Sequence, residues 1–272
     1  MLNSNSGAVT PVGDAVTGAI AERDLFDKAE FYRLFWRRSS VVYRGEAFRM
    51  LNLRLGSEDA MALAAVARTA SITSVVGRAD GGMTFVNQVQ RVSPRLRDAA
   101  RTLDAELGWR STTFDLSVST TAGVGIGCHF DHSDNLVLQQ EGAKLWRVGS
   151  PEDTGNDARR ARMLEVHDFV PTTPAPGGDA VLLAAGDMLY VPLFAPHEGI
   201  AKGPSVSVSA SFNAESPASL LGHALMSELS RATVWWSPLP LDIPEDQGDL
   251  VEQVVTRAAR RVIAENLRSD RR

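Results

Sequence analysis

The stretch that decides the fold is residues 129–146, HFDHSDNLVLQQEGAKLW. It contains His129 and His132, two of the five histidines in the chain, interleaved with two aspartates ahead of a strand-like run. Successive side chains of a β-strand point to opposite faces, so His129 and Asp131 are expected to share one face. The pattern predicts that one strand delivers an imidazole and a carboxylate to the same metal ion.

A complete metal site needs a ligand from elsewhere in the chain. A non-haem Fe(II) centre of the facial type uses two neutral imidazoles and one carboxylate, and leaves the opposite face of the metal open. His197, which ends the segment AGDMLYVPLFAPH, is the candidate for the third ligand. Lys144 stands one hairpin after His129, and its ammonium would suit a dicarboxylate cosubstrate.

Composition argues against several classes of protein. The 272 residues are 44% hydrophobic and 22% charged, as in a water-soluble globule with a sizeable core. A formal net charge of -5 is unlike that of a general nucleic-acid binder. Cys128 is the single cysteine, so no disulfide framework can form. The sequence has no membrane-length apolar run and no secretory signal pattern, so we expect a cytoplasmic protein without nucleic-acid or membrane partners.

Helices are expected on both sides of a strand-rich centre, wherever apolar residues recur at helical spacing. The segments are 21–38, 57–71, 94–107, 216–232 and 248–269. Ser57 is expected to cap the N-terminus of the second helix, and Gly108 the C-terminus of the third. Residues 1–20 are small and polar, and we expect them to form a flexible leader.

Between these helices the residue pattern is that of an antiparallel sandwich or barrel. Short segments rich in Val, Ser and Thr are separated by Gly, Pro and Asp, which is typical of strands joined by turns. The segments are 39–45, 112–127, 135–140, 143–149, 180–192 and 205–212. The polar, proline-rich insert at 151–178 is expected to be a long connection with one short helix.

Taken in order, the motifs resemble the JmjC and cupin-like Fe(II)- and 2-oxoglutarate-dependent oxygenases, over residues 25–213. The motifs are His129-Phe130-Asp131, Asn135, Gln140-Glu141-Gly142 leading to Lys144 and Trp146, Gly186-Asp187, Leu189-Tyr190, and Pro192 leading to His197. The resemblance implies a mainly β fold with flanking helices, the double-stranded β-helix (jelly-roll) of the cupin superfamily. We expect this domain over residues 21–214, followed by a helical C-terminal region at 215–272.

The resemblance also implies roles for individual residues. His129, Asp131 and His197 would hold Fe(II), and Lys144 would bind the distal carboxylate of 2-oxoglutarate, with O2 as the oxidant. Two further residues, Asn135 and Ser211, match positions that lie near the cosubstrate in the family. Substrate contacts are candidate roles for His132 and Asp134, although structural or turn-forming roles fit both.

The chain departs from the family at two places near these residues. Leu193-Phe194-Ala195-Pro196 replaces a tryptophan-containing sequence before the distal histidine, which bears on the shape of the substrate site. Ile126 stands where the asparaginyl-hydroxylase branch has a threonine, so one hydrogen bond to the cosubstrate must come from another side chain. Neither change removes a metal ligand.

Three functions remain open on the sequence alone. The first is hydroxylation of a C–H bond in an amino-acid-like or peptide substrate of a biosynthetic or modification pathway, and an alternative is a ribosomal-type protein side-chain hydroxylase. The third is a metal-binding cupin without oxygenase activity, which would have no need of Lys144.

An apolar helical face also predicts a homodimer through the C-terminal region. That face consists of Leu220, Leu221, Leu225 and Leu229.

Overall fold

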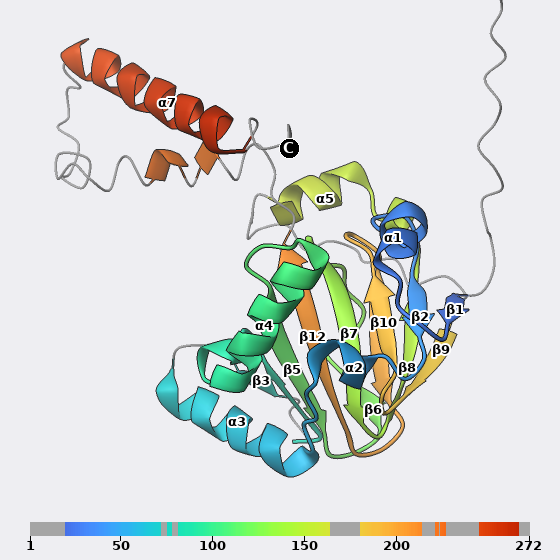
Figure 1. Ribbon diagram of the computed structural model, residues 1–272. Coiled ribbons are helices and arrows are strands. Elements are labelled where there is room, and N and C mark those ends of the chain that lie inside the picture. The colour runs from blue at the N-terminus through green and yellow to red at the C-terminus, as the bar shows by residue number, and fades with distance from the viewer. Residues whose placement is uncertain are drawn as a thin grey trace, which may run out of the picture.

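The computed structural model describes residues 20–71, 75–77, 81–163, 180–213, 221–222, 224–226 and 245–266. Its centre is a pair of β-sheets that face each other, as predicted for a jelly-roll domain with flanking helices (Figure 1). The described strands form two stacked sheets rather than one closed barrel.

The larger sheet has eight strands. In spatial order they are β1 (Ala21–Arg23), β2 (Val41–Tyr43), β10 (Met188–Val191), β7 (Ser133–Glu141), β12 (Ser205–Asn213), β5 (Thr113–Ser119), β4 (Met83–Val86) and β3 (Val75–Gly77). Apart from the parallel pair of β1 and β2, neighbouring strands run antiparallel. The strands that come from distant parts of the chain, such as β7 and β12, therefore lie side by side.

The smaller sheet has four antiparallel strands. They are β6 (Gly123–Val124), β11 (His197–Ala201), β8 (Ala143–Val148) and β9 (Ala180–Ala184), in spatial order. Residues of both sheets pack together between the layers, for example Val137 and Leu189 of the larger sheet with Val148 and Leu183 of the smaller. The predicted segment 180–192 is two strands, because Gly186 turns the chain with a φ of 99° and sends β9 and β10 into different sheets.

Alternation along β12 explains how the larger sheet separates its two faces. The side chains of Val206, Val208 and Ala210 join the core under the helices. The serines between them face the other way, and Ser207 and Ser209 line the cavity between the sheets. The period-2 pattern SVSVSAS therefore gives this strand an apolar outer face and a hydroxyl-rich inner face.

Three helices cover the outer face of the larger sheet: α2 (Ala47–Leu51), α3 (Ser57–Ala70) and α4 (Pro94–Leu107) (Figure 1). Helix α4 is confirmed as predicted. The Ser93 side chain accepts from the Leu96 N–H at its start, and Gly108 ends it with a φ of 78°. The cap predicted at Ser57 is wrong: Gly56 is the N-cap of α3, and the N–H and hydroxyl of Ser57 both donate to Glu141.

The helix predicted over 21–38 is also shorter than expected. Residues 21–23 form β1, and the helical part comprises α1 (Lys28–Glu30) and a π-helical turn, η1 (Phe31–Phe35). The backbone of β1 pairs with β2, and the Asp27 side chain accepts from the Glu30 N–H, which fixes the start of the helix. Tertiary pairing therefore overrides the helical spacing of the apolar residues.

The insert and the C-terminal region are described only in part. Residues 151–163 contain η3 (Pro151–Asp153) and α5 (Asn156–Met163), which supplies the expected short helix. Helix α7 (Glu245–Asn266) lies in the C-terminal region, and none of the described helices is long and apolar enough to cross a membrane. Leu220 and Leu229 fall outside the described residues, as does the leader up to residue 19, so the dimer and the flexible leader remain predictions.

Replacing Gly142 by alanine should destabilise the fold sharply. Gly142 turns the chain between β7 and β8 with a φ of 66°, and a Cβ there would lie 2.1 Å from the backbone oxygen of Pro204. We expect a loss of at least about 3 kcal/mol in the free energy of unfolding, measured by urea denaturation. Gly108→Ala is the matched control, because Gly108 has a similar φ of 78° but no atom within 4 Å of the added Cβ. That control should cost about 1 kcal/mol, and equal losses in both variants would contradict the steric argument.

Candidate metal centre

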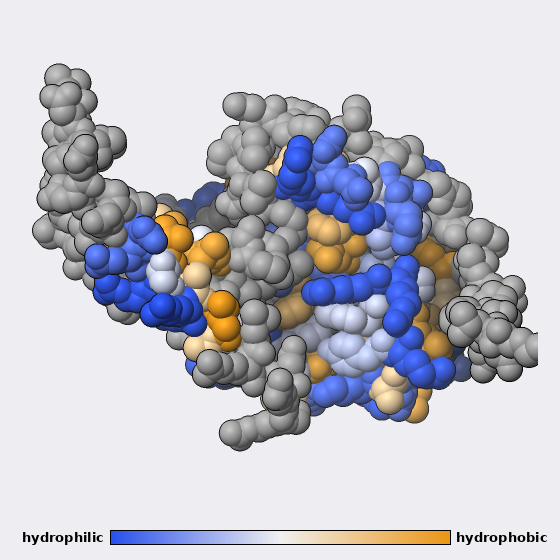
Figure 2. Space-filling view, turned by 90° about the horizontal axis from the view of Figure 1, so that it is seen from above, coloured by the Kyte–Doolittle hydropathy of each residue, from blue (hydrophilic) through white to orange (hydrophobic). Residues whose placement is uncertain are grey.

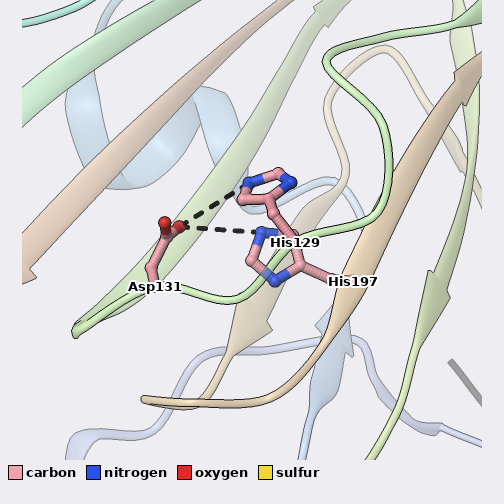
Figure 3. Close-up of side chains that lie close together, drawn as sticks. All are labelled: His129, Asp131 and His197. Atoms are coloured by element: carbon pink, nitrogen blue, oxygen red, sulfur yellow. Dashed lines mark ion pairs between the residues drawn. The ribbon is translucent and has the colours of Figure 1, made fainter. Parts of the chain in front are cut away.

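Three side chains converge at one end of the space between the sheets. The Asp131 Oδ2 lies 3.9 Å from the His129 Nε2 and 3.7 Å from the His197 Nε2 (Figure 3). One ligand atom from each residue lies within 4.8 Å of the others. This spacing allows all three atoms to bind a single ion, at the residues that the sequence singled out.

Backbone pairing brings the two histidines together. The His197 N–H donates to the His129 carbonyl at 2.7 Å, and the His129 N–H donates to the His197 carbonyl at 3.1 Å. The prediction that His129 and Asp131 lie on one regular strand is wrong, because β7 begins only at Ser133 and His129 forms an isolated bridge with His197. His197 begins β11 rather than ending the strand before it.

Hydrogen bonds to backbone carbonyls fix the orientation of both imidazoles. The Nδ1 of His129 lies 2.9 Å from the Gly127 carbonyl oxygen, and the Nδ1 of His197 lies 2.9 Å from that of Ala195. A carbonyl oxygen only accepts, so each Nδ1 carries the proton and each Nε2 presents its lone pair to the centre. Burial lowers the pKa of His197 to about 4, which keeps that imidazole neutral. Both rings are thus prepared to act as metal ligands.

The Asp131 carboxylate is held from two sides. Its Oδ2 accepts from the Asn135 amide at 3.1 Å, and the Asn135 Oδ1 accepts from the Ser211 hydroxyl at 2.6 Å. Burial opposes ionisation of Asp131, but the facing imidazoles of His197 and His129 and the guanidinium of Arg162 outweigh it, and the pKa lies below its ordinary value. The carboxylate therefore stays ionised and oriented at neutral pH.

Lys144 lies in the same cavity without a carboxylate partner among the described residues. Its side chain is buried, and its Nζ donates to the hydroxyls of Ser117 at 2.9 Å and Ser207 at 2.8 Å. Burial lowers the pKa of Lys144 to about 8. A buried cation held only by neutral hydroxyls is an unfavourable arrangement that an anionic ligand would relieve.

The cavity joins the metal centre to Lys144. Its lining residues are Phe85, Asp115, Ser117, Gly125, Ile126, His129, Asp131, Asn135, Val137, Lys144, Trp146, His197, Gly199, Ser207 and Ser209. Gly199 leaves room for the Trp146 ring, since a Cβ at Gly199 would lie 3.1 Å from it. Helix α5 lies beyond the sheets at the upper end of Figure 1, and Figure 2 looks down on that end, where hydrophilic side chains surround hydrophobic ones.

Several lining residues escaped the sequence analysis. The Asp115 side chain accepts from the Gln88 N–H at 2.8 Å, and burial raises the pKa of Asp115 to about 6. Ser117, Ser207 and Ser209 also line the cavity. The period-2 alternation of β5 and β12 could have placed these residues on one face, but it could not show that this face meets Lys144.

The other predicted residues have different surroundings. Ser211 reaches Asp131 through Asn135 and is not among the residues that line the cavity. The fully buried carboxylate of Asp134 accepts from the Tyr190 hydroxyl at 2.7 Å and from the Arg37 Nε at 3.0 Å, and the substrate contact considered for this residue stays a prediction. Asp134 directly precedes Asn135 in β7, so the two side chains lie on opposite faces of the strand and that of Asp134 points away from the cavity. His132 precedes β7 and is not among the lining residues, so its substrate role remains a prediction.

Comparison with known proteins finds a match to one family model. Residues 90–220 match the family model described as JmjC domain. This match agrees with the resemblance to the JmjC and cupin-like oxygenases seen in the sequence.

Among its relatives is the ribosomal protein uL16 3-hydroxylase of Escherichia coli strain K12, which is 30% identical over 116 residues. The aligned part is 42% of this chain and 28% of that relative. The X-ray structure of E. coli ycfD matches with a TM-score of 0.61 at 19% identity, over 90% of this chain and 69% of that one. A structure of this ribosomal oxygenase with cobalt and 2-oxoglutarate matches with a TM-score of 0.57 at 19% identity, over 89% and 68%. These structural matches confirm the predicted fold.

Replacing Asn135 by alanine should weaken metal binding while leaving the fold intact. The substitution removes the amide that holds the Asp131 Oδ2, and loss of such a supporting hydrogen bond typically costs roughly 10- to 100-fold in metal affinity. The measurement is a calorimetric titration with Co(II). Ser133→Ala is the control, because the Ser133 hydroxyl reaches Asn135 only at 3.4 Å. Equal Co(II) affinity in both variants would show that Asn135 does not orient the carboxylate.

Replacing Lys144 by methionine should stabilise the ligand-free protein. At neutral pH the folded state carries a buried ammonium, and a pKa of about 8 against an ordinary 10.5 corresponds to a cost of about 3 kcal/mol. Between these two pKa values the unfolded chain binds more protons, so the stability of the wild type should rise with pH. The free-energy difference between variant and wild type should therefore be largest near pH 7 and shrink towards pH 10.

The measurement for Lys144→Met is urea denaturation at several pH values. The free energies of unfolding of variant and wild type are subtracted at each pH, which removes the contribution of the other titrating groups. Lys202→Met is the control, because Lys202 is exposed at the end of β11. A pH-independent difference for Lys144→Met would contradict the burial argument.

Proposed function

We propose that this protein is an Fe(II)- and 2-oxoglutarate-dependent oxygenase that hydroxylates an amino-acid side chain of a protein substrate. The observation that carries the proposal is the presence, in one cavity, of the His129–Asp131–His197 cluster and the uncompensated ammonium of Lys144. The cluster fits a divalent metal, since it offers two imidazole lone pairs and an ionised carboxylate.

The roles of the residues follow from their chemistry. His129, Asp131 and His197 would hold the iron, and three protein ligands leave coordination positions for a chelating cosubstrate and for O2. The bound iron, with 2-oxoglutarate and O2, would supply the oxidising chemistry that places a hydroxyl group on a C–H bond. Lys144 would bind the distal carboxylate of 2-oxoglutarate, with Ser117 and Ser207 orienting the ammonium. These serines also offer the hydroxyls that Ile126 cannot provide.

Part of the cavity lining is apolar and consists of Phe85, Ile126, Val137 and Trp146. An ion pair between Lys144 and a carboxylate is stronger in such a site than in water, because the effective dielectric constant is lower. Asn135 would keep Asp131 oriented, and Ser211 would act through Asn135 rather than on the cosubstrate directly.

The comparisons favour a protein substrate over the amino-acid-like substrate considered first. The curated relative is named for hydroxylation of a ribosomal protein, and the related solved structures are described as a ribosomal oxygenase. We therefore propose that the substrate is a side chain of a ribosomal or similar cytoplasmic protein. A small amino-acid-like substrate is the second candidate, and a metal-binding cupin without oxygenase activity is disfavoured by the buried Lys144 in the cavity.

Anaerobic addition of Fe(II) and then 2-oxoglutarate should produce a metal-to-ligand charge-transfer band in visible absorbance. The band should require both additions, vanish in His129→Ala, and weaken strongly in Lys144→Met because the distal carboxylate loses its cation. Lys202→Met should retain the band, since its ammonium is exposed and outside the cavity. Absence of the band from folded wild-type protein would overturn the oxygenase proposal.

The substrate class has its own test. Incubation of the active protein with isolated ribosomal proteins should add the mass of one oxygen atom to a peptide, located by tandem mass spectrometry. Uncoupled turnover of 2-oxoglutarate with no modified peptide would instead favour the small-molecule substrate.

A further inference from the structure

The two oxygens of the Asp131 carboxylate face different partners. Oδ2 lies toward the Nε2 atoms of His129 and His197 and accepts from Asn135. Oδ1 lies 3.6 Å from a terminal guanidinium nitrogen of Arg162. One oxygen is thus turned to the metal centre, and the other to a cation outside it.

Arg162 comes from helix α5, which belongs to the insert and to neither sheet. Its side chain is 49% exposed, and that of Asp131 is 25% exposed, so the contact lies at the mouth of the site. The other ion pair on this helix, between Arg160 and Asp157, joins neighbouring turns of α5 and is well exposed. Of the described α5 arginines, Arg162 is the one that pairs with a residue of the metal centre.

The segment before α5 is fastened to the loop that leads into His197. The Thr154 hydroxyl donates to the Phe194 carbonyl at 2.7 Å, and the Arg159 guanidinium stacks 5.3 Å from the centroid of the Phe194 ring. The Phe194 N–H in turn donates to the Asp131 carbonyl at 3.0 Å. These contacts link α5 to both segments that carry the candidate ligands, so the approach of Arg162 is supported by a connected set of interactions.

A carboxylate can bind a metal through one oxygen or through both. If Asp131 used both, it would occupy a position that a chelating cosubstrate needs. A guanidinium at Oδ1 favours the one-oxygen mode, because it gives that oxygen a charged partner away from the metal.

We propose that Arg162 is a positioning residue that holds the Oδ1 of Asp131, so that the carboxylate offers only Oδ2 to the metal. This inference rests on the metal site proposed above. Helix α5 of the insert would then orient a metal ligand, although it supplies no ligand itself.

The test compares Co(II) and 2-oxoglutarate binding in Arg162→Met, Arg162→Lys and wild type. In Arg162→Met the carboxylate is free to bind through both oxygens. The Kd for 2-oxoglutarate of the Co(II)-loaded protein should rise about tenfold, and the visible Co(II) spectrum should change. The Kd for Co(II) itself should not rise, because the substitution also removes a positive charge beside the metal. Arg162→Lys should restore part of the 2-oxoglutarate affinity.

Arg160→Met is the matched control, since Arg160 lies on the same helix and its partner is Asp157. It should leave both affinities and the spectrum unchanged. An unchanged spectrum and 2-oxoglutarate affinity in Arg162→Met would overturn the inference, as would equal loss of Co(II) and 2-oxoglutarate binding. Failure of the wild type to bind Co(II) and 2-oxoglutarate would instead overturn the proposed function, whatever the variants do.

Discussion

The pair of backbone hydrogen bonds between His129 and His197 is the contact on which the candidate centre depends. It joins the start of β11 to the segment before β7, two parts of the chain that lie far apart in sequence. The two imidazole centroids are consequently 4.3 Å apart. Because Gly127 and Ala195 in the same segments accept from the ring Nδ1 atoms, the backbone also determines which nitrogen each ring presents. The main-chain hydrogen bonds thereby set the tautomer of both imidazoles.

The alternating faces of the larger sheet explain how one layer can serve both stability and chemistry. Val206 and Val208 bury apolar surface under the helices. Burial of apolar surface is the dominant favourable contribution to folding. Ser207 on the opposite face replaces part of the hydration that the Lys144 ammonium loses on burial. The protein keeps this unfavourable cation in its interior, and functional sites commonly retain such groups at the expense of stability.

The loop before His197 departs from the family pattern where it meets the insert. Phe194 has a φ of 66°, a rare conformation for a bulky residue. Its carbonyl, ring and N–H are all engaged, by Thr154, Arg159 and Asp131 respectively. Surrounding contacts of this kind are what allow a strained backbone to persist. The unusual loop and the arginine-rich helix α5 are therefore parts of one local structure.

The sequence by itself determined the features that depend on local pattern. The period-2 runs predicted the strands, the amphipathic segment 94–107 with Gly108 predicted α4, and the spacing of His129, Asp131 and Lys144 selected the residues of the centre. The strands and α4 follow from neighbours along the chain, because side-chain direction in a strand or helix is set by its regular repeat. His129 and Asp131 reach the same centre although they lie outside a regular strand.

Only the tertiary structure decided which of these residues meet, and through which atoms. Asp134 is adjacent to Asn135 in sequence, yet it is buried against Tyr190 and Arg37, while Asn135 supports Asp131. The contact of Arg162 with Asp131 has no sequence pattern at all. Such contacts join segments separated by whole strands and loops, so their distances depend on how the two sheets stack and on where the insert folds back. The candidate residues of the centre could therefore be identified from the sequence. Their charge pairs and hydrogen bonds depend on the packing of distant segments.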